Sequence, residues 1–230
     1  MNVLARALHR ASLPLLRLYL RRRVRRLVLE RWSDRPLLVL PEVLNPVVFR
    51  SGVFLADTLA ALPRPERPGA APRALDMGTG TGIGAVALAR AGFSVLAVDV
   101  NPEAVRCARI NALLNRVEAR VEAREGDLFA PAGEERFSVV AFNPPFFDGT
   151  PSDPLDAAWR SDDVLPRFAA ALPAHLAPGG LALVLLSDHG EEERQRALLE
   201  RAGMTVALHA RRDYGSEVLT VWAARRREER

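Results

Sequence analysis

The sequence DMGTGTG at residues 76–82 decides the fold of this chain of 230 residues. It follows a short apolar run at 74–77, which predicts a strand, and precedes an alanine-rich stretch at 82–91, which predicts a helix. Glycines in such a turn permit positive φ and let a ligand approach the backbone, while the first amides of the helix face an anionic group. The segment therefore predicts a strand, a ligand-binding turn and a helix in succession.

Apolar and helical stretches alternate on both sides of this turn. We expect strands at 74–77, 94–98, 117–122, 137–142 and 181–186, and helices at 52–62, 82–91, 102–114, 163–176 and 191–202. Two last extended runs, 205–210 and 217–224, have no helix between them, which suits an antiparallel end of a sheet. The pattern predicts an α/β fold with a doubly wound, mostly parallel sheet of seven strands and an antiparallel last strand.

The first 29 residues carry eight arginines and no acidic residue, whereas the rest of the chain holds 24 arginines against 28 acidic residues. Apolar residues recur at helical spacing in this basic head: Leu4, Leu8, Ala11, Leu15, Leu18, Leu20, Val24, Leu27 and Val28. We therefore expect a basic amphipathic helical segment over 1–35 and one larger domain over 36–230. We favour packing of the helix on that domain over contact with RNA, because charge runs are usually solvated faces.

Cysteine and histidine usage limits the chemistry. Cys107 is the one cysteine, and the four histidines lack the spacing of zinc ligands, so we expect no metal site. No run of 18 apolar residues occurs, so we expect no membrane span. These features predict a reduced, cytoplasmic protein.

The glycines alone leave the ligand open. Gly80, Gly82 and Ala85 also satisfy the dinucleotide fingerprint G-x-G-x-x-G/A, which keeps an NAD- or FAD-dependent oxidoreductase as an alternative. Asp76, two residues before Gly78, would repel a pyrophosphate but pair with an ammonium group. It therefore favours a ligand with an amino-acid moiety.

Two further carboxylates follow the next predicted strands. Asp99 ends the strand at 94–98, where a carboxylate can accept both hydroxyls of a ribose. Asp127 follows the strand at 117–122 and could accept from an adenine amino group. A helix cap or an ordinary loop carboxylate is an equally weighted alternative for Asp127.

The sequence NPPF at residues 143–146 ends the strand at 137–142. Two prolines fix φ and stop the strand, so we expect Asn143 to be held at the carboxyl edge of the sheet. The side-chain carbonyl of Asn143 and the backbone carbonyl of Pro144 can accept both hydrogens of a planar NH2 group. Phe146 can stack on that group. A structural turn with two aromatic residues in the core is the alternative.

In this order, the segments DMGTGTG, VDVNPEA, GDLF and NPPF resemble the class I S-adenosylmethionine-dependent methyltransferases, and among them the HemK/PrmC-like group that methylates planar nitrogens. The resemblance spans residues 49–224 and implies a Rossmann-like methyltransferase domain over 36–230. For the cofactor it implies Asp76, Gly78, Gly80 and Gly82 at the methionine moiety, Asp99 on the ribose, and Val100, Asp127 and Leu128 around the adenine. It implies Asn143, Pro144 and Phe146 at the methyl acceptor, with Asn143 also beside the cofactor.

We therefore predict N-methylation of a glutamine amide, as in release factors, or of an exocyclic amine of a base in RNA or DNA. Release-factor enzymes of the group typically carry Tyr where this chain has Phe146, and relatives acting on ribosomal RNA carry Phe, so the acceptor stays open. A small-molecule acceptor, the oxidoreductase and a non-enzymatic RNA-binding module are the alternatives. We expect residues 50–52 to shape the substrate entrance.

Overall fold

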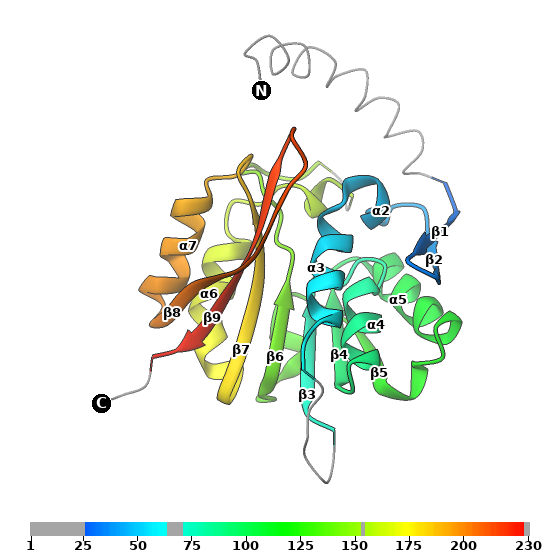
Figure 1. Cartoon of the computed structure of the whole chain (residues 1–230), viewed down its shortest axis with the longest axis horizontal. Coiled ribbons are helices and arrows are strands. Elements are labelled where there is room, and N and C mark those ends of the chain that lie inside the picture. Colours follow the sequence, from blue (N-terminus) through cyan, green and yellow to red (C-terminus); the bar gives the residue numbers. More distant parts are fainter. Residues whose placement is uncertain (1–25, 64–70, 153–154, 228–230) are drawn as a thin grey trace.

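The computed structural model describes residues 26–63, 71–152 and 155–227, which form a two-stranded hairpin and a seven-stranded sheet covered by helices (Figure 1). The strands are β1 (Val28–Trp32), β2 (Arg35–Val39), β3 (Arg73–Met77), β4 (Ser94–Asp99), β5 (Val121–Glu125), β6 (Phe137–Phe142), β7 (Leu176–Ser187), β8 (Met204–Asp213) and β9 (Val218–Arg226). The helices are α2 (Pro46–Phe49), α3 (Ser51–Ala60), α4 (Ile83–Arg90), α5 (Pro102–Leu114), α6 (Val164–His175) and α7 (Glu192–Arg201).

The large sheet has the strand order β5-β4-β3-β6-β7-β9-β8. Strands β3 to β7 are parallel, and β9 is antiparallel to both of its neighbours. The prediction of a doubly wound, mostly parallel sheet with an antiparallel end is confirmed. The chain order reverses between β3 and β6, and ligands of such sheets bind at the carboxyl ends of the strands beside this point.

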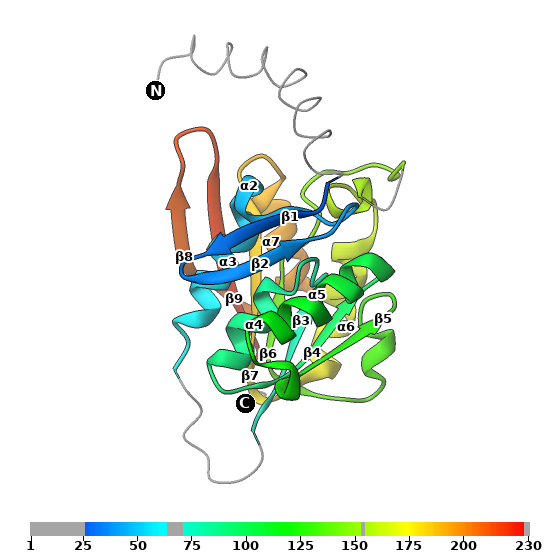
Figure 2. The same ribbon diagram turned by 90° about the vertical axis from the view of Figure 1, so that its right-hand side faces the viewer.

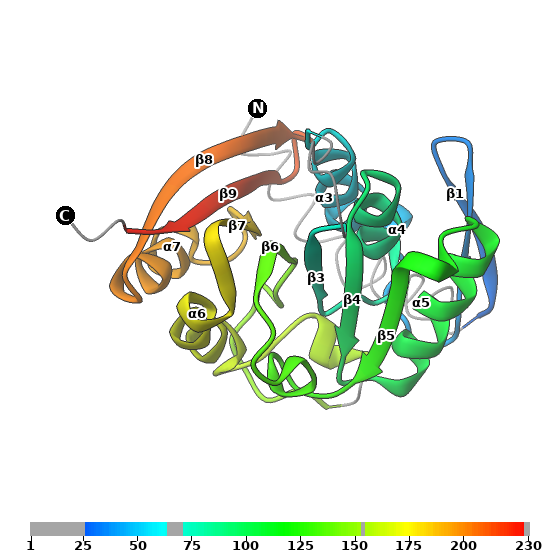
Figure 3. The same ribbon diagram turned by 90° about the horizontal axis from the view of Figure 1, so that it is seen from below.

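Helices cover both faces of the sheet (Figure 3). Buried side chains of α3, α4 and α5 form one core with one face, and those of α6 and α7 form the second core with the other. Because β3, β4, β6 and β7 are buried on both faces, their sequences are continuous apolar runs rather than alternating ones. Most predicted elements agree with the structure within a few residues. The strand predicted at 117–122 begins only at Val121, because a short 3-10 helix, Glu118–Arg120, precedes it.

The predicted helical segment over 1–35 is wrong in its last part. Residues 1–25 lie outside the described residues, but β1 and β2 form an antiparallel hairpin in which Val28 pairs with Val39. Figure 2 shows this hairpin beside α5. The buried Asn111 of α5 accepts from the Leu38 amide at 2.7 Å and donates to the Leu38 carbonyl at 2.7 Å. The boundary at 35/36 is therefore also wrong, since it would cut the hairpin that packs on the domain.

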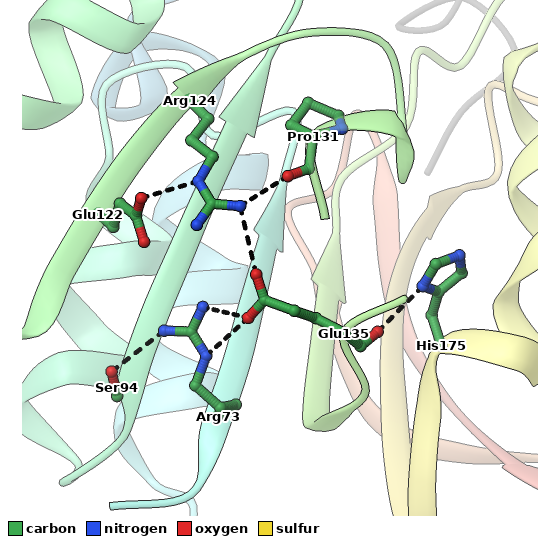
Figure 4. Close-up of polar contacts among 7 residues, drawn as sticks. All are labelled: Arg73, Ser94, Glu122, Arg124, Pro131, Glu135 and His175. Carbon is green, nitrogen blue, oxygen red and sulfur yellow. Dashed lines mark hydrogen bonds and ion pairs between the residues drawn. The ribbon is translucent and has the colours of Figure 1, made fainter. Parts of the chain in front are cut away.

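A set of paired charges, here called the Glu135 network, ties the start of β3 to β5 (Figure 4). Arg73 donates to Glu135 Oε2 from both Nε, at 3.1 Å, and Nη2, at 2.5 Å. Arg124 donates to Glu135 Oε1 at 3.2 Å and to Glu122 at 2.8 Å. Arg73 also reaches Ser94 at 3.2 Å. Both carboxylate oxygens of Glu135 are thus bound by guanidinium groups.

Candidate active site

A cavity of about 170 Å³ lies at the carboxyl ends of β3, β4, β5 and β6. Eight of the predicted site residues line it: Asp76, Gly78, Gly80, Asp99, Val100, Asp127, Leu128 and Asn143. Segments that the sequence did not point to complete the wall, among them Glu42–Leu44, Pro46 and Leu55. The reversal of strand order therefore brings together residues that are up to 67 positions apart.

The three glycines of the turn are needed for different reasons. Gly78, Gly80 and Gly82 have φ values of 60°, 54° and 79°, in the left-handed region that side chains disfavour. A Cβ on Gly82 would lie 2.7 Å from the Cα atom of Ala108, so this glycine lets the turn pack on α5. Gly82 does not line the cavity, whereas Gly78 and Gly80 do. A Cβ on Gly80 would meet no described atom within 4 Å, which leaves this position open to a ligand.

Asp76 is buried at the end of β3 and faces the start of α4. Its Oδ2 atom accepts from the Thr79 hydroxyl at 2.5 Å and from the Ala85 amide at 2.8 Å. Burial raises the pKa of Asp76 to about 7, because loss of water outweighs these two hydrogen bonds. Gly84 is required beside it, since a Cβ there would lie 2.4 Å from Asp76 Oδ1.

Asp99 is fixed by the backbone on both sides. Its Oδ2 atom accepts from the Gly80 amide and its Oδ1 atom from the Asn101 amide, each at 2.9 Å. Burial raises the pKa of this carboxyl group as well. A carboxylate offers about four lone-pair positions, so Asp99 keeps acceptor capacity for a ligand. The adjacent Val100 side chain is 55% exposed and presents an apolar surface at the cavity wall.

Asp127 lines the cavity but has a partner from another helix. Its carboxylate, about half exposed, pairs with Arg167 of α6. Arg167 also contacts Asp163, with an N···O distance of 2.9 Å. Leu128, next in sequence, has a positive φ of 47°. The predicted hydrogen bond from adenine to Asp127 stays a prediction, and such a bond would share this carboxylate with Arg167.

Asn143 enters the cavity from the end of β6. Its Nδ2 atom donates to the Ser51 hydroxyl at 3.2 Å, and its buried Oδ1 atom has no hydrogen-bond partner among the described residues. The buried Thr81 hydroxyl, which lines the same cavity, has no partner there either. Buried polar atoms are nearly always hydrogen-bonded, so two unpartnered atoms in one cavity point to a ligand.

Two residues of the NPPF turn face away from this cavity. Residues that precede proline are extended, and side chains alternate in extended backbone, so Asn143 and Pro145 share one side. Pro145 lines the cavity, whereas Pro144 is buried and Phe146 lines a second, smaller cavity with Phe147. The side chains of Pro144 and Phe146 are thus not among those that line the cavity with Asn143. Their proposed roles toward an acceptor stay predictions.

Ser51 is the residue whose role the sequence indicated least. It is buried at the first position of α3 and bonds Asn143, which is 92 positions later. The only signal was its place in the 50–52 segment before the glycine turn. The described ranges hold no group of three His, Cys, Asp or Glu side chains that could bind a metal ion, and none of their helices is long and apolar enough to cross a membrane.

A doubly wound sheet with a glycine turn after its first strand and a carboxylate at the end of the next strand is typical of the Rossmann-like class. Residues 51–215 match the family model of the methyltransferase small domain. The chain therefore belongs to this methyltransferase family, which overturns the oxidoreductase and the non-enzymatic alternatives.

Curated relatives agree with this assignment. A putative protein N5-glutamine methyltransferase of Methanocaldococcus jannaschii is 32% identical over 156 residues, which cover 64% of this chain and 78% of the relative. The release factor glutamine methyltransferase of Bordetella pertussis is 34% identical over 161 residues, 63% of this chain and 57% of the relative. The chain thus spans little more than half of the bacterial relative.

Among solved structures, the T. thermophilus 16S rRNA N2 G1207 methyltransferase, in complex with AdoMet and guanosine, gives a TM-score of 0.64 at 21% identity. The match covers 88% of this chain and 50% of that one. The E. cuniculi Mtq2–Trm112 complex gives 0.61 at 22% identity, with 81% and 99% covered. These two likenesses show the shared fold.

Proposed function

We propose that the protein transfers a methyl group from S-adenosylmethionine to a planar nitrogen of a protein or nucleic-acid acceptor. The cavity's charge supports this cofactor. Its charged lining residues in the described part of the chain are Glu42, Asp76, Asp99 and Asp127, all acidic. S-adenosylmethionine carries two cationic centres and one carboxylate, so an acidic cavity favours it over a dinucleotide with two phosphates.

The described residues fit the parts of this cofactor. Asp99 would accept from the ribose hydroxyls through its remaining lone-pair positions, and Val100 would cover one face of the adenine. Asp76 would pair with the ammonium group, which favours the ionised carboxylate and lowers its raised pKa. The bound cofactor supplies an electrophilic methyl group on a positively charged sulfur.

The unpartnered Oδ1 atom of Asn143 is the observation that carries the proposed acceptor chemistry. This oxygen can accept an N–H of a planar NH2 group and thereby turn the nitrogen lone pair toward the methyl group. It also stabilises the positive charge that develops on nitrogen. The Ser51 hydroxyl holds the other end of the amide, so Asn143 is oriented before an acceptor arrives.

The names of the relatives indicate two classes of methyl acceptor. The Bordetella and Methanocaldococcus relatives are named for glutamine methylation, whereas a 36% identical relative from Alcanivorax borkumensis is named ribosomal RNA small subunit methyltransferase C. These names support, as the acceptor that we propose for this chain, a glutamine amide of a protein or a base amine of RNA. A cytoplasmic location remains a prediction that fits either acceptor.

Methyl transfer by Asn143→Ala tests the proposal. With labelled cofactor and two acceptor pools, purified release factor and total ribosomal RNA, transfer should fall about a hundredfold or more. Affinity for S-adenosylhomocysteine should stay within a few-fold, because the amide acts on the acceptor. Ser51→Ala should give a smaller loss, since Asn143 keeps its carbonyl. Transfer at the wild-type rate by Asn143→Ala would show that the acceptor is not a planar nitrogen held by this side chain.

A further inference from the structure

Arg50 joins α2 to α3 in a backbone conformation that glycine usually supplies. Its φ of 62° and ψ of −29° are left-handed, although arginine has a Cβ. Four other described non-glycine residues have positive φ: Ser33, Glu42, Arg116 and Leu128. A strained residue at a site often reflects a use of its side chain.

The Arg50 guanidinium is exposed and lies 5.1 Å from the centre of the Tyr214 ring. No ion pair or hydrogen bond of this guanidinium occurs in the part of the chain that the structure describes. Its neighbour Arg212 differs: it lies 4.8 Å from the Phe54 ring and 3.1 Å from the Asp57 carboxylate. Arg50 is thus held in place by an aromatic ring while its charge stays free for a ligand.

Arg50 is next in sequence to a residue that bonds Asn143, which we assign to the acceptor. The next residue, Ser51, bonds Asn143. The preceding residue, Phe49, contacts Trp159 edge-to-face at 4.4 Å, and the Trp159 carbonyl accepts from the Phe147 amide at 3.0 Å. The α2–α3 junction therefore meets the chain that follows the NPPF turn, and Figure 1 shows α2 at the same end of the molecule as the β8–β9 turn.

We propose that Arg50 is a specificity residue that binds a phosphate of a single-stranded RNA acceptor whose target base reaches Asn143. This inference rests on the proposed function and selects RNA from its two acceptor classes. A guanidinium without a carboxylate partner binds phosphate through two parallel hydrogen bonds. Aromatic rings interleaved with arginines, here Tyr214 and Trp159, are typical of single-strand binding surfaces.

RNA binding by full-length Arg50→Gly tests this proposal. The probe is a fluorescein-labelled single-stranded RNA of mixed sequence, about 20 nucleotides long, titrated at several salt concentrations with saturating S-adenosylhomocysteine. Affinity should fall about three- to tenfold, and the log–log salt slope should lose about 0.7, the share of one phosphate contact. The unfolding temperature should stay or rise, because glycine suits the positive φ.

Arg116→Gly is a matched control. Arg116 is also an exposed arginine with a positive φ, 57°, but it follows the far end of α5. The 13 residues of α5 span about 20 Å, so this charge is remote from Asn143. Its RNA affinity and salt slope should equal those of the wild type. Arg50→Lys keeps the charge and should keep the slope while losing part of the affinity.

Three results would overturn the proposal: equal salt slopes for Arg50→Gly and the wild type, equal losses for the two glycine variants, or no RNA binding by the wild type. Arg50-dependent binding of an acidic peptide in place of RNA would assign the residue to a protein acceptor and likewise contradict it. Calorimetry with S-adenosylhomocysteine on the same samples keeps the proposed function separate. Cofactor binding with failed RNA binding rejects only the role of Arg50.

Discussion

The Glu135 network and the polar groups of the cavity belong to the same sheet, yet they differ in how their polar atoms are paired. In the network, Arg73 and Arg124 bind both oxygens of Glu135. In the cavity, the Thr81 hydroxyl and Asn143 Oδ1 are buried without partners, and the pKa of Asp76 is raised to about 7. One region is fully paired within the chain, and the other leaves two buried polar atoms without a partner among the described residues.

This difference separates stability from function. A buried polar atom without a partner costs about 1 to 3 kcal/mol, so folding alone disfavours such atoms. The parallel strands and both cores offset that cost in the free protein. We therefore expect substitutions in the Glu135 network to change stability, and substitutions in the cavity to change binding and catalysis.

The largest effect on binding is expected from Gly84→Ala. The new Cβ would lie 2.4 Å from Asp76 Oδ1, and neither α4 nor the buried carboxylate can move without disturbing the glycine turn. Affinity for S-adenosylhomocysteine should fall by about a hundredfold or more in calorimetry. The control Gly203→Ala has no described atom within 4 Å of its Cβ and a φ of 83°. It should cost about 1 kcal/mol of stability with unchanged affinity, and equal affinities for both variants would contradict the account.

Asp99→Ala should change ligand binding without changing stability, and Glu135→Ala should change stability without changing binding. Asp99→Ala should weaken the binding of S-adenosylhomocysteine more than tenfold, because charged hydrogen bonds to the ribose are lost, while the fold survives.

Glu135→Ala should lower the free energy of unfolding by about 1 to 2 kcal/mol, since its partly exposed ion pairs are screened, and should leave the affinity for S-adenosylhomocysteine unchanged. Parallel denaturation and calorimetry check both. A binding defect in Glu135→Ala would show that the two regions are not separable.

The raised pKa of Asp76 predicts two opposite pH dependences. Because the folded pKa of Asp76, about 7, exceeds the ordinary aspartate value of 3.8, the contribution of this group to stability is full below pH 4 and is lost as pH rises to about 7. Ligand binding instead requires the ionised Asp76 carboxylate, which would pair with the ammonium group. Affinity for S-adenosylhomocysteine should therefore rise with pH up to about 7 to 8, by at most about tenfold per pH unit. Asp76→Asn should remove both dependences. An affinity that stays flat from pH 5.5 to 8 in the wild type would show that Asp76 does not pair with the ammonium group.

Thr81→Val should give the smallest effect. Removing a buried hydroxyl without a partner should leave the free protein equally stable or more stable by up to about 1 kcal/mol. If the hydroxyl donates to the bound cofactor, affinity should fall a few-fold in the same variant. A clear loss of stability in the free protein would mean that the hydroxyl has a partner within the fold.

The fold could be predicted largely because its signals are local. A few consecutive residues are enough to indicate the apolar strands β3, β6 and β7 and the glycine turn. The cavity residues Asp76 and Asp99 could be predicted for the same reason, because each lies at the end of such a strand. The hairpin β1–β2 was missed because Leu20, Val24, Leu27 and Val28 also satisfy helical spacing, and only its packing on Asn111 distinguishes the two structures. Short apolar runs do not by themselves separate helix from strand.

The remaining errors concern partners that are distant in sequence. Arg167 is 40 positions from Asp127 and Ser51 is 92 positions from Asn143, so no spacing rule connects them. The acceptor role of Phe146 stays a prediction, although its side chain lines the second cavity and not the one that Asn143 lines. The alternation of side chains in the extended NPPF turn sends Phe146 to the other side.

The central claim is that the acidic cavity binds S-adenosylmethionine, and calorimetric titration of the full-length protein with S-adenosylhomocysteine and with NADH tests it most directly. The account predicts saturable binding of S-adenosylhomocysteine with one site per chain and no heat with NADH, since Asp76, Asp99 and Asp127 would face its phosphates. Binding of NADH without binding of S-adenosylhomocysteine would contradict the account.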